Sequence, residues 1–182
     1  MRSMRLIVIA GPAGSGKTTL ANELARLHQM KHIDFDVVTA EIVSNRRAEN
    51  PGVSESDLLV RVKQERYLVM AQAVAQARGK EAPGCDCLLV SAPFTGISQS
   101  QEAWNEWLAA CGDFETVNFI WLTVDSHIRL DRIRNRGSER DEKVLSGASS
   151  LELAPQPVIS HQLVDSSQPL ARQCQALSAL FS

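Results

Sequence analysis

The segment Gly11-Pro12-Ala13-Gly14-Ser15-Gly16-Lys17-Thr18 matches the pattern G-x-x-x-x-G-K-[ST] at every fixed position. It follows a short, apolar, β-branched run at residues 6–10, which is typical of a buried strand. Leucines recur at helical spacing over residues 17–28, directly after it. A glycine loop between a strand and a helix N-terminus turns backbone N–H groups inward and forms an anion site. The segment therefore predicts a loop that binds a chain of phosphate groups.

The chemistry of this loop suggests a role for its side chains. Lys17 reaches the β- and γ-phosphates as a point charge, and the Thr18 hydroxyl can ligate Mg²⁺. The expected nucleotide-binding residues are Gly11, Ala13, Gly14, Ser15, Gly16, Lys17, Thr18 and Thr19.

Five apolar, β-rich runs alternate with amphipathic segments along the chain. We expect strands at residues 6–10, 31–34, 87–90, 116–124 and 158–164, helices at 17–28, 36–46, 54–78, 101–110 and 126–136, and a last helix that begins at Pro169. The 54–78 helix is long enough that a break inside it is expected. Right-handed crossovers then give an α/β fold, in which an open parallel sheet carries helices on both faces. Ligands of such sheets bind beyond the carboxyl ends of the strands.

The composition is that of an ordinary globular domain. Apolar residues are 44% and charged residues 22% of 182, so we expect a single folded domain over residues 1–182 and not a disordered chain. The apolar run at 6–10 is too short to cross a bilayer, and it ends in a glycine loop unlike a signal peptide. Four cysteines do not make a disulfide scaffold. These features predict a cytoplasmic protein that has no membrane association.

The formal net charge of -2 conceals an uneven distribution of basic residues. Of the seven Lys and Arg residues after position 90, six fall between Arg129 and Lys143. A chain so near charge balance is not expected to bind a long nucleic-acid track, since that binding depends on many phosphate contacts.

With this loop and this order of elements, the chain resembles the small P-loop kinases of the nucleoside-monophosphate-kinase-like group. That group includes shikimate kinase, gluconate kinase and chloramphenicol phosphotransferase. The resemblance is strong at the phosphate loop and extends over most of the chain. It implies a three-layer P-loop NTPase fold whose five-stranded parallel sheet has the order 2-3-1-4-5. It also implies ATP as phosphoryl donor, Mg²⁺ as metal and a small-molecule hydroxyl as acceptor.

Two carboxylates, Asp34 and Asp36, lie at the end of the second expected strand, on the same side of an extended segment. The resembling kinases carry an Asp-x-Asp there. By that resemblance, Asp34 helps to hold the metal, and Asp36 orients the acceptor hydroxyl or takes its proton. The alternative is that Asp36 caps the next helix. His32 is interpreted as a structural strand residue.

The third strand ends without the acid that many P-loop proteins have there. Ser91 stands in its place, and a serine supplies no charge, so the charge has to come from Asp34. Residues 92–95 are expected either to line the acceptor pocket, within an acceptor region at about 35–110, or to form a turn without a role in binding. By resemblance, Arg61 and Arg66 are candidate acceptor-binding residues on the following helix.

The basic segment resembles the lid that closes over ATP between the fourth and fifth strands of these kinases. A lid at about 136–157 follows from that resemblance. It assigns Arg132, Arg136 and Arg140 to the transferred phosphoryl group, because guanidinium is always charged and forks onto phosphate oxygens. Arg129 and Arg134 are interpreted as members of a solvated helix face, with Asp131 paired to Arg134.

Three functions are compatible with these features. The first is an ATP- and Mg²⁺-dependent kinase of a small molecule. The second has a nucleotide or a polynucleotide 5′ end as acceptor, and the third is an ATP-binding regulatory module without an acceptor. The sequence has no N-K-x-D tetrad of a GTPase, and the chain is shorter than helicases and AAA+ machines usually are.

Overall fold

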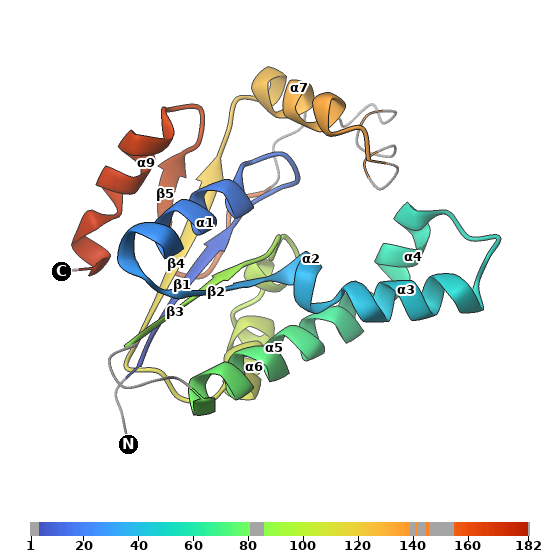
Figure 1. Ribbon diagram of the computed structural model, residues 1–182, viewed down its shortest axis with the longest axis horizontal. Helices are drawn as coiled ribbons and strands as arrows, with labels where there is room; N and C mark the ends of the chain where they lie inside the picture. The colour runs from blue at the N-terminus through green and yellow to red at the C-terminus, as the bar shows by residue number, and fades with distance from the viewer. Residues whose placement is uncertain (1–3, 81–85, 139–140, 142–144, 146–154, 182) are drawn as a thin grey trace.

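The computed structural model describes residues 4–80, 86–138, 141, 145 and 155–181. Arg140 and most of the expected lid at 136–157 lie outside the described residues. Figure 1 shows a central sheet with helices on both sides and a pair of helices that projects away from it.

The sheet has five parallel strands in the order β2-β3-β1-β4-β5, as predicted. The central strand β1 (Arg5–Ala10) pairs with β3 (Cys87–Ser91) and β4 (Thr116–Thr123). The edge strands are β2 (Lys31–Asp34) and β5 (Gln162–Asp165). The carboxyl ends of β1, β2 and β3 therefore lie next to one another, where the phosphate loop begins.

Side chains of β1 alternate between two cores, as the period of a strand requires. Leu6 and Val8 join a cluster with α5 (Lys63–Lys80) and α6 (Gln101–Cys111). Ile7 and Ile9 join the cluster on the opposite face, with α1 (Lys17–His28). The C-terminal α9 (Leu170–Ala176) and η4 (Ser178–Phe181) pack beside α1 on that face (Figure 1). This doubly covered sheet fixes the position of the phosphate loop.

The last strand differs from the prediction of residues 158–164. The strand occupies Gln162–Asp165, and the apolar residues before it form a loop. Val158 is 64% exposed, and its N–H donates to Ser98 O at 2.9 Å, next to η1 (Ile97–Gln99). Ile159 is buried in the core cluster of α5 and α6. Ile159 thus lies in a loop and packs into the core. A run of hydrophobic residues does not distinguish such a loop from a buried strand.

The expected helix at 36–46 is divided at Thr39 into α2 (Phe35–Val38) and α3 (Ala40–Glu49). The expected break in the 54–78 helix is confirmed, since α4 (Glu55–Arg61) ends before α5 begins. No residue of α3 is buried, and α3 and α4 form the pair that projects from the body in Figure 1. α7 (Ser126–Arg136) follows β4 and ends at Gly137, whose φ is 59°.

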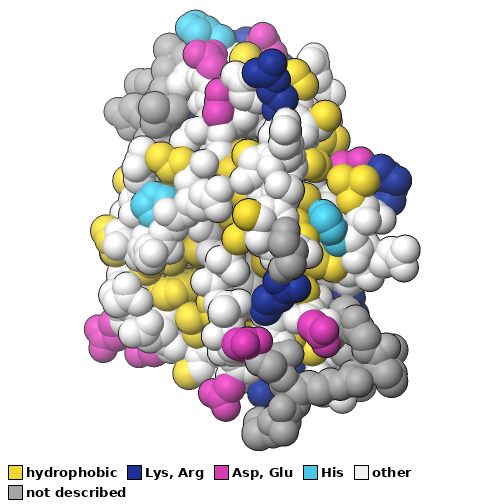
Figure 2. Space-filling view, turned by 90° about the vertical axis from the view of Figure 1, so that its left-hand side faces the viewer, with side chains coloured by type: hydrophobic (Ala, Val, Ile, Leu, Met, Phe, Trp, Pro, Cys, Tyr) yellow, Lys and Arg dark blue, Asp and Glu magenta, His cyan; other side chains and the backbone are white. Residues whose placement is uncertain are grey.

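Within the described part of the chain, no helix is both long and apolar enough to cross a membrane. On the face shown in Figure 2, the acidic and basic side chains of the described residues are scattered and do not gather into one patch of a single sign.

Candidate active site

The phosphate loop depends on left-handed backbone conformations that only glycine adopts easily. Gly14 has a φ of 78° and Gly16 a φ of 86°. A Cβ on Gly14 would lie 2.8 Å from Ile133 Cγ1 and 3.0 Å from the Arg129 carbonyl, so the loop packs directly against α7. The Lys17 ammonium donates to Pro12 O at 2.8 Å across the loop.

The loop forms one wall of a cleft of about 770 Å³ beyond the carboxyl ends of the strands. This volume is within the usual range for small-molecule sites. Of the expected nucleotide-binding residues, those that line the cleft are Ala13, Gly14, Gly16, Lys17, Thr18 and Thr19. Gly11 and Ser15 support the loop from behind: Ser15 is fully buried, and a Cβ on Gly11 would lie 2.8 Å from Ser15 Oγ.

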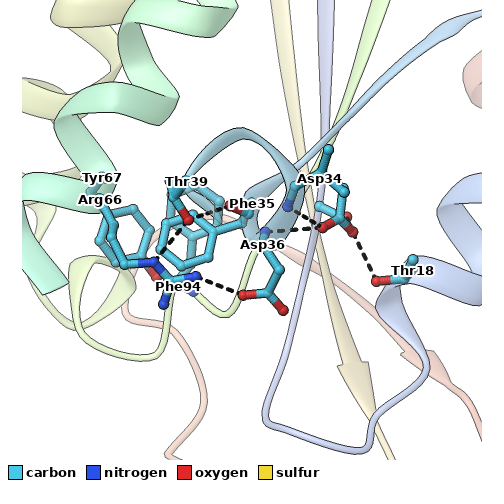
Figure 3. Close-up of polar contacts among 10 residues, drawn as sticks. Thr18, Asp34, Phe35, Asp36, Thr39, Arg66, Tyr67 and Phe94 are labelled. Carbon is cyan, nitrogen blue, oxygen red and sulfur yellow. Dashed lines mark hydrogen bonds and ion pairs between the residues drawn. The ribbon is translucent and has the colours of Figure 1, made fainter. Parts of the chain in front are cut away.

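Asp34 is held by hydrogen bonds to both of its carboxylate oxygens. Oδ2 accepts from the hydroxyls of Thr18 at 2.9 Å and Ser91 at 3.0 Å. Oδ1 accepts the N–H groups of Asp36 at 2.9 Å and Val37 at 3.3 Å, so Asp34 is the N-cap of α2 (Figure 3). The alternative that Asp36 caps this helix is therefore wrong.

A hydroxyl and a carboxylate in contact beside a phosphate loop suit Mg²⁺, which prefers hard oxygen ligands and shares them with phosphates. Thr18 is the residue that would present oxygen to the metal. Asp34 would act on it indirectly, because its lone pairs already accept the four donors described above.

A series of hydrogen bonds links Asp34 to Ser91, His32 and Asn22. His32 Nε2 lies 2.8 Å from Ser91 Oγ, and His32 Nδ1 lies 2.8 Å from Asn22 Oδ1. Burial lowers the pKa of His32, and the charge of Asp34 partly opposes this. The sequence analysis missed this contact. One signal was available in the sequence, namely strand alternation, which puts His32 and Asp34 on one side. The register that pairs Asp34 with Ser91 is known only from the structure.

Asp36 points into the cleft and forms an ion pair with Arg66 of α5. Arg66 Nη2 lies 2.6 Å from Asp36 Oδ1, and Arg66 Nε donates to Thr39 Oγ1 at 2.8 Å (Figure 3). The guanidinium also lies 4.2 Å over the Phe35 ring. The side chain of Arg66 is 9% exposed and that of Asp36 is 51% exposed, so a buried cation holds an accessible carboxylate.

The two arginines expected to bind the acceptor are placed differently. Arg66 lines the cleft, whereas Arg61 is exposed at the end of α4 and is absent from the described residues that line it. The acceptor role of Arg61 stays a prediction.

The wall opposite the phosphate loop is built on an aromatic core. Phe94 has a φ of 51°, and its N–H donates to the hydroxyl of Tyr67 at 2.8 Å. Burial raises the pKa of Tyr67, so its hydroxyl stays neutral. This bond holds the turn after β3, where Ala92, Pro93 and Thr95 line the cleft and Phe94 is buried. That residues 92–95 line an acceptor pocket stays a prediction.

The arginines of α7 reach the cleft from above the loop. Arg132 donates to Ser166 O at 2.8 Å and to Ser166 Oγ at 3.2 Å, and it comes within 3.5 Å of Gly14 O. Arg136 Nε donates to Asp141 at 2.8 Å, and both of these side chains line the cleft.

Two other arginines of α7 were expected on a solvated face. For Arg134 this is confirmed, because it is exposed and pairs with Asp131 at 3.2 Å. For Arg129 it is wrong, because Arg129 is 6% exposed and lines the cleft where α7 packs on Gly14.

The fold and the site together define a P-loop nucleotide-binding protein. The family model described as "AAA domain" matches residues 7–152, more than half of the chain, and the chain belongs to that family. No curated protein matches the sequence.

Several solved structures with similar folds are described as kinases. APS kinase from Mycobacterium tuberculosis, in complex with AMPPNP and APS, has a TM-score of 0.62 at 14% identity, over 99% of this chain and 98% of that one. Shikimate kinase from Bacteroides thetaiotaomicron has a TM-score of 0.60 at 14% identity, over 98% of each chain. A gluconokinase from Sinorhizobium meliloti has a TM-score of 0.57 at 18% identity, over 99% and 95%. At these identities the likeness establishes the fold, which is that of the predicted kinase group.

Proposed function

We propose that this protein transfers the γ-phosphoryl group of ATP to a hydroxyl of a small molecule and requires Mg²⁺. The observation that carries the proposal is the placement of two carboxylates on one side of the cleft. Asp34 accepts a hydrogen bond from the Thr18 hydroxyl, which we assign to the metal, and Asp36 lines the same cleft. A nucleotide-binding module has no need of the second carboxylate.

The residues on the phosphate side neutralise charge. Loop N–H groups and Lys17 bind the β- and γ-phosphates, and Thr18 would hold Mg²⁺, which would neutralise phosphate charge. Arg132 and Arg136 face this region from α7 and stabilise the charge that develops on the transferred group. Ser166 and Gln168, which follow β5, line the part of the cleft that we assign to the adenine of ATP.

The residues on the opposite side align the acceptor. Arg66 keeps Asp36 in place, and Asp36 accepts a hydrogen bond from the acceptor hydroxyl. The hydroxyl oxygen forms a bond to the γ-phosphorus as the bond from that phosphorus to the β–γ bridging oxygen breaks. The proton passes to Asp36, and ADP leaves. Catalysis of this kind depends mainly on alignment and charge neutralisation.

The direct test is ADP release from ATP with Mg²⁺ and a panel of acceptors. The panel contains sugars, sugar acids, nucleosides, nucleotides, aminoglycoside-like alcohols and oligonucleotides with a 5′ hydroxyl. Acceptor-dependent ADP release with a compound of the first classes supports the proposal. Release only with nucleotides or oligonucleotides identifies the second function instead, and ATP binding without release with any acceptor supports a regulatory module.

A matched pair of arginines on α7 tests the assignment of charge stabilisation. We expect Arg132→Ala to lower kcat by about 10²-fold, because one preformed donor is lost from the phosphoryl site. Arg134→Ala is the control, since Arg134 is exposed and pairs with the surface residue Asp131. Steady-state kinetics measures both, and thermal unfolding shows whether each variant is folded. Equal kcat values for the two variants would remove Arg132 from the mechanism.

A further inference from the structure

The end of β3 lacks the acid that many P-loop proteins have there, and Ser91 occupies its position. Ser91 is 2% exposed, and its Oγ lies between two groups, 3.0 Å from Asp34 Oδ2 and 2.8 Å from His32 Nε2. The side chain is thus the middle of a chain of polar contacts that begins on α1 at Asn22 and ends on the same helix at Thr18.

The direction of this chain follows from counting protons. A serine hydroxyl has one proton, so Ser91 donates either to Asp34 or to His32. An ionised carboxylate only accepts hydrogen bonds. If the Ser91 hydroxyl proton pointed away from Asp34, lone pairs of Ser91 Oγ and Asp34 Oδ2 would face each other at 3.0 Å. Ser91 therefore donates to Asp34 and accepts from His32.

His32 must then donate from Nε2, which leaves Nδ1 as the acceptor atom of the neutral ring. The side-chain amide of Asn22 lies at Nδ1, with Oδ1 at 2.8 Å. Rotation of this amide by half a turn replaces the oxygen with an N–H donor at the same place. Every donor then meets an acceptor, in the order Asn22, His32, Ser91 and Asp34.

We infer that His32 is a positioning residue for the metal site and acts through Ser91. The Nε2–H of His32 donates to Ser91 Oγ, so that Ser91 donates to Asp34. Asp34 also accepts a hydrogen bond from the Thr18 hydroxyl, which leaves a lone pair of Thr18 directed to the cleft. This inference rests on the proposed function, in which Thr18 holds Mg²⁺. The neutral side chains of His32 and Ser91 thus orient Asp34 and Thr18, as an acid at the end of β3 would otherwise do.

The test measures the coupling between metal and nucleotide, with ADP as the probe. The ratio of the ADP dissociation constant in EDTA to that in excess Mg²⁺, obtained by calorimetry, reports this coupling. We expect His32→Leu to lower the ratio by about tenfold, since groups that orient metal ligands change metal affinity by about 10–100-fold when they are replaced. His32→Gln, whose side-chain N–H reaches the place of Nε2, should retain the wild-type ratio.

Ser91→Ala separates an action through Ser91 from a general structural role. It should lower the ratio as His32→Leu does, and the double variant should show no further loss, because both changes break the same chain. Thermal unfolding confirms that the variants are folded. If His32→Leu does not fold, Ser91→Ala and His32→Gln carry the test.

Each outcome bears on one of the two proposals. A wild-type ratio in His32→Leu or Ser91→Ala, additive losses in the double variant, or a folded His32→Gln that behaves like His32→Leu overturns the inference. A wild-type protein that binds no ADP, or binds it equally with and without Mg²⁺, contradicts the proposed function instead.

Discussion

Lys17→Ala is expected to lower kcat/KM for phosphoryl transfer by at least about 10²–10³-fold, the usual cost of removing one preformed charge-stabilising group. Lys17 lines the cleft at the first residue of α1, and its ammonium lies over the loop that receives the phosphates. The fold should survive, because the side chain lies at the surface of the cleft and not in either core. We expect the thermal unfolding midpoint to change by less than about 2 °C.

Lys63→Ala is the matched control for this variant. Lys63 is exposed at the start of α5 and is absent from the described residues that line the cleft. Its activity should equal that of the wild type in the same ADP-release assay. Undiminished turnover by Lys17→Ala would mean that the phosphate loop does not perform the reaction.

Asp36→Asn is expected to lower kcat by about 10²–10⁴-fold while the KM for ATP changes little. The amide keeps the shape of the side chain but cannot take the acceptor proton. The change also removes the negative charge that faces Arg66, whose side chain is 9% exposed. Because Asp36 itself is 51% exposed and the amide oxygen still accepts from Arg66, we expect a stability loss of only about 1 kcal/mol.

Steady-state kinetics at varied ATP and acceptor concentrations, together with thermal unfolding, measures both effects of this change. Asp131→Asn is the control, since Asp131 is 69% exposed and pairs with the exposed Arg134. A folded Asp36→Asn enzyme that keeps the wild-type kcat would exclude Asp36 as the base. A regulatory module would likewise be indifferent to this substitution.

The sheet and the phosphate loop could be predicted because their signals are local. A β-branched run, a glycine loop and leucines at helical spacing each lie within a few residues, and right-handed crossovers leave few ways to connect them. The helices Lys17–His28 and Ser126–Arg136 begin and end at the predicted residues for the same reason.

The misassigned features depend on contacts between segments far apart in the sequence. Thr39 divides the expected helix because its hydroxyl donates to Phe35 O at 2.6 Å and accepts from Arg66, 27 residues later. Ile159 is apolar because it fills the core of α5 and α6 from a loop. Arg129 is buried because Gly14, on a distant loop, offers it a surface without a Cβ.

The site shows the same division. Single residues of the loop and the Asp-x-Asp could be named from motifs, because each motif is contiguous. The link from His32 to Asp34 passes through Ser91 of another strand, 59 residues from His32. Such a link becomes visible only when the strand order and the register are known.

The projecting helix α3 has no buried residue, and the described contacts that tie it to α4 and α5 include surface ion pairs of Arg46 with Glu65 and Arg47 with Glu55. Substitutions at such positions usually change stability by less than about 0.5 kcal/mol. The sheet and the phosphate loop, by contrast, are constrained by two closely packed cores. In evolution, the exposed helix α3 can therefore accumulate substitutions at little folding cost, whereas the residues of the two cores stay constrained.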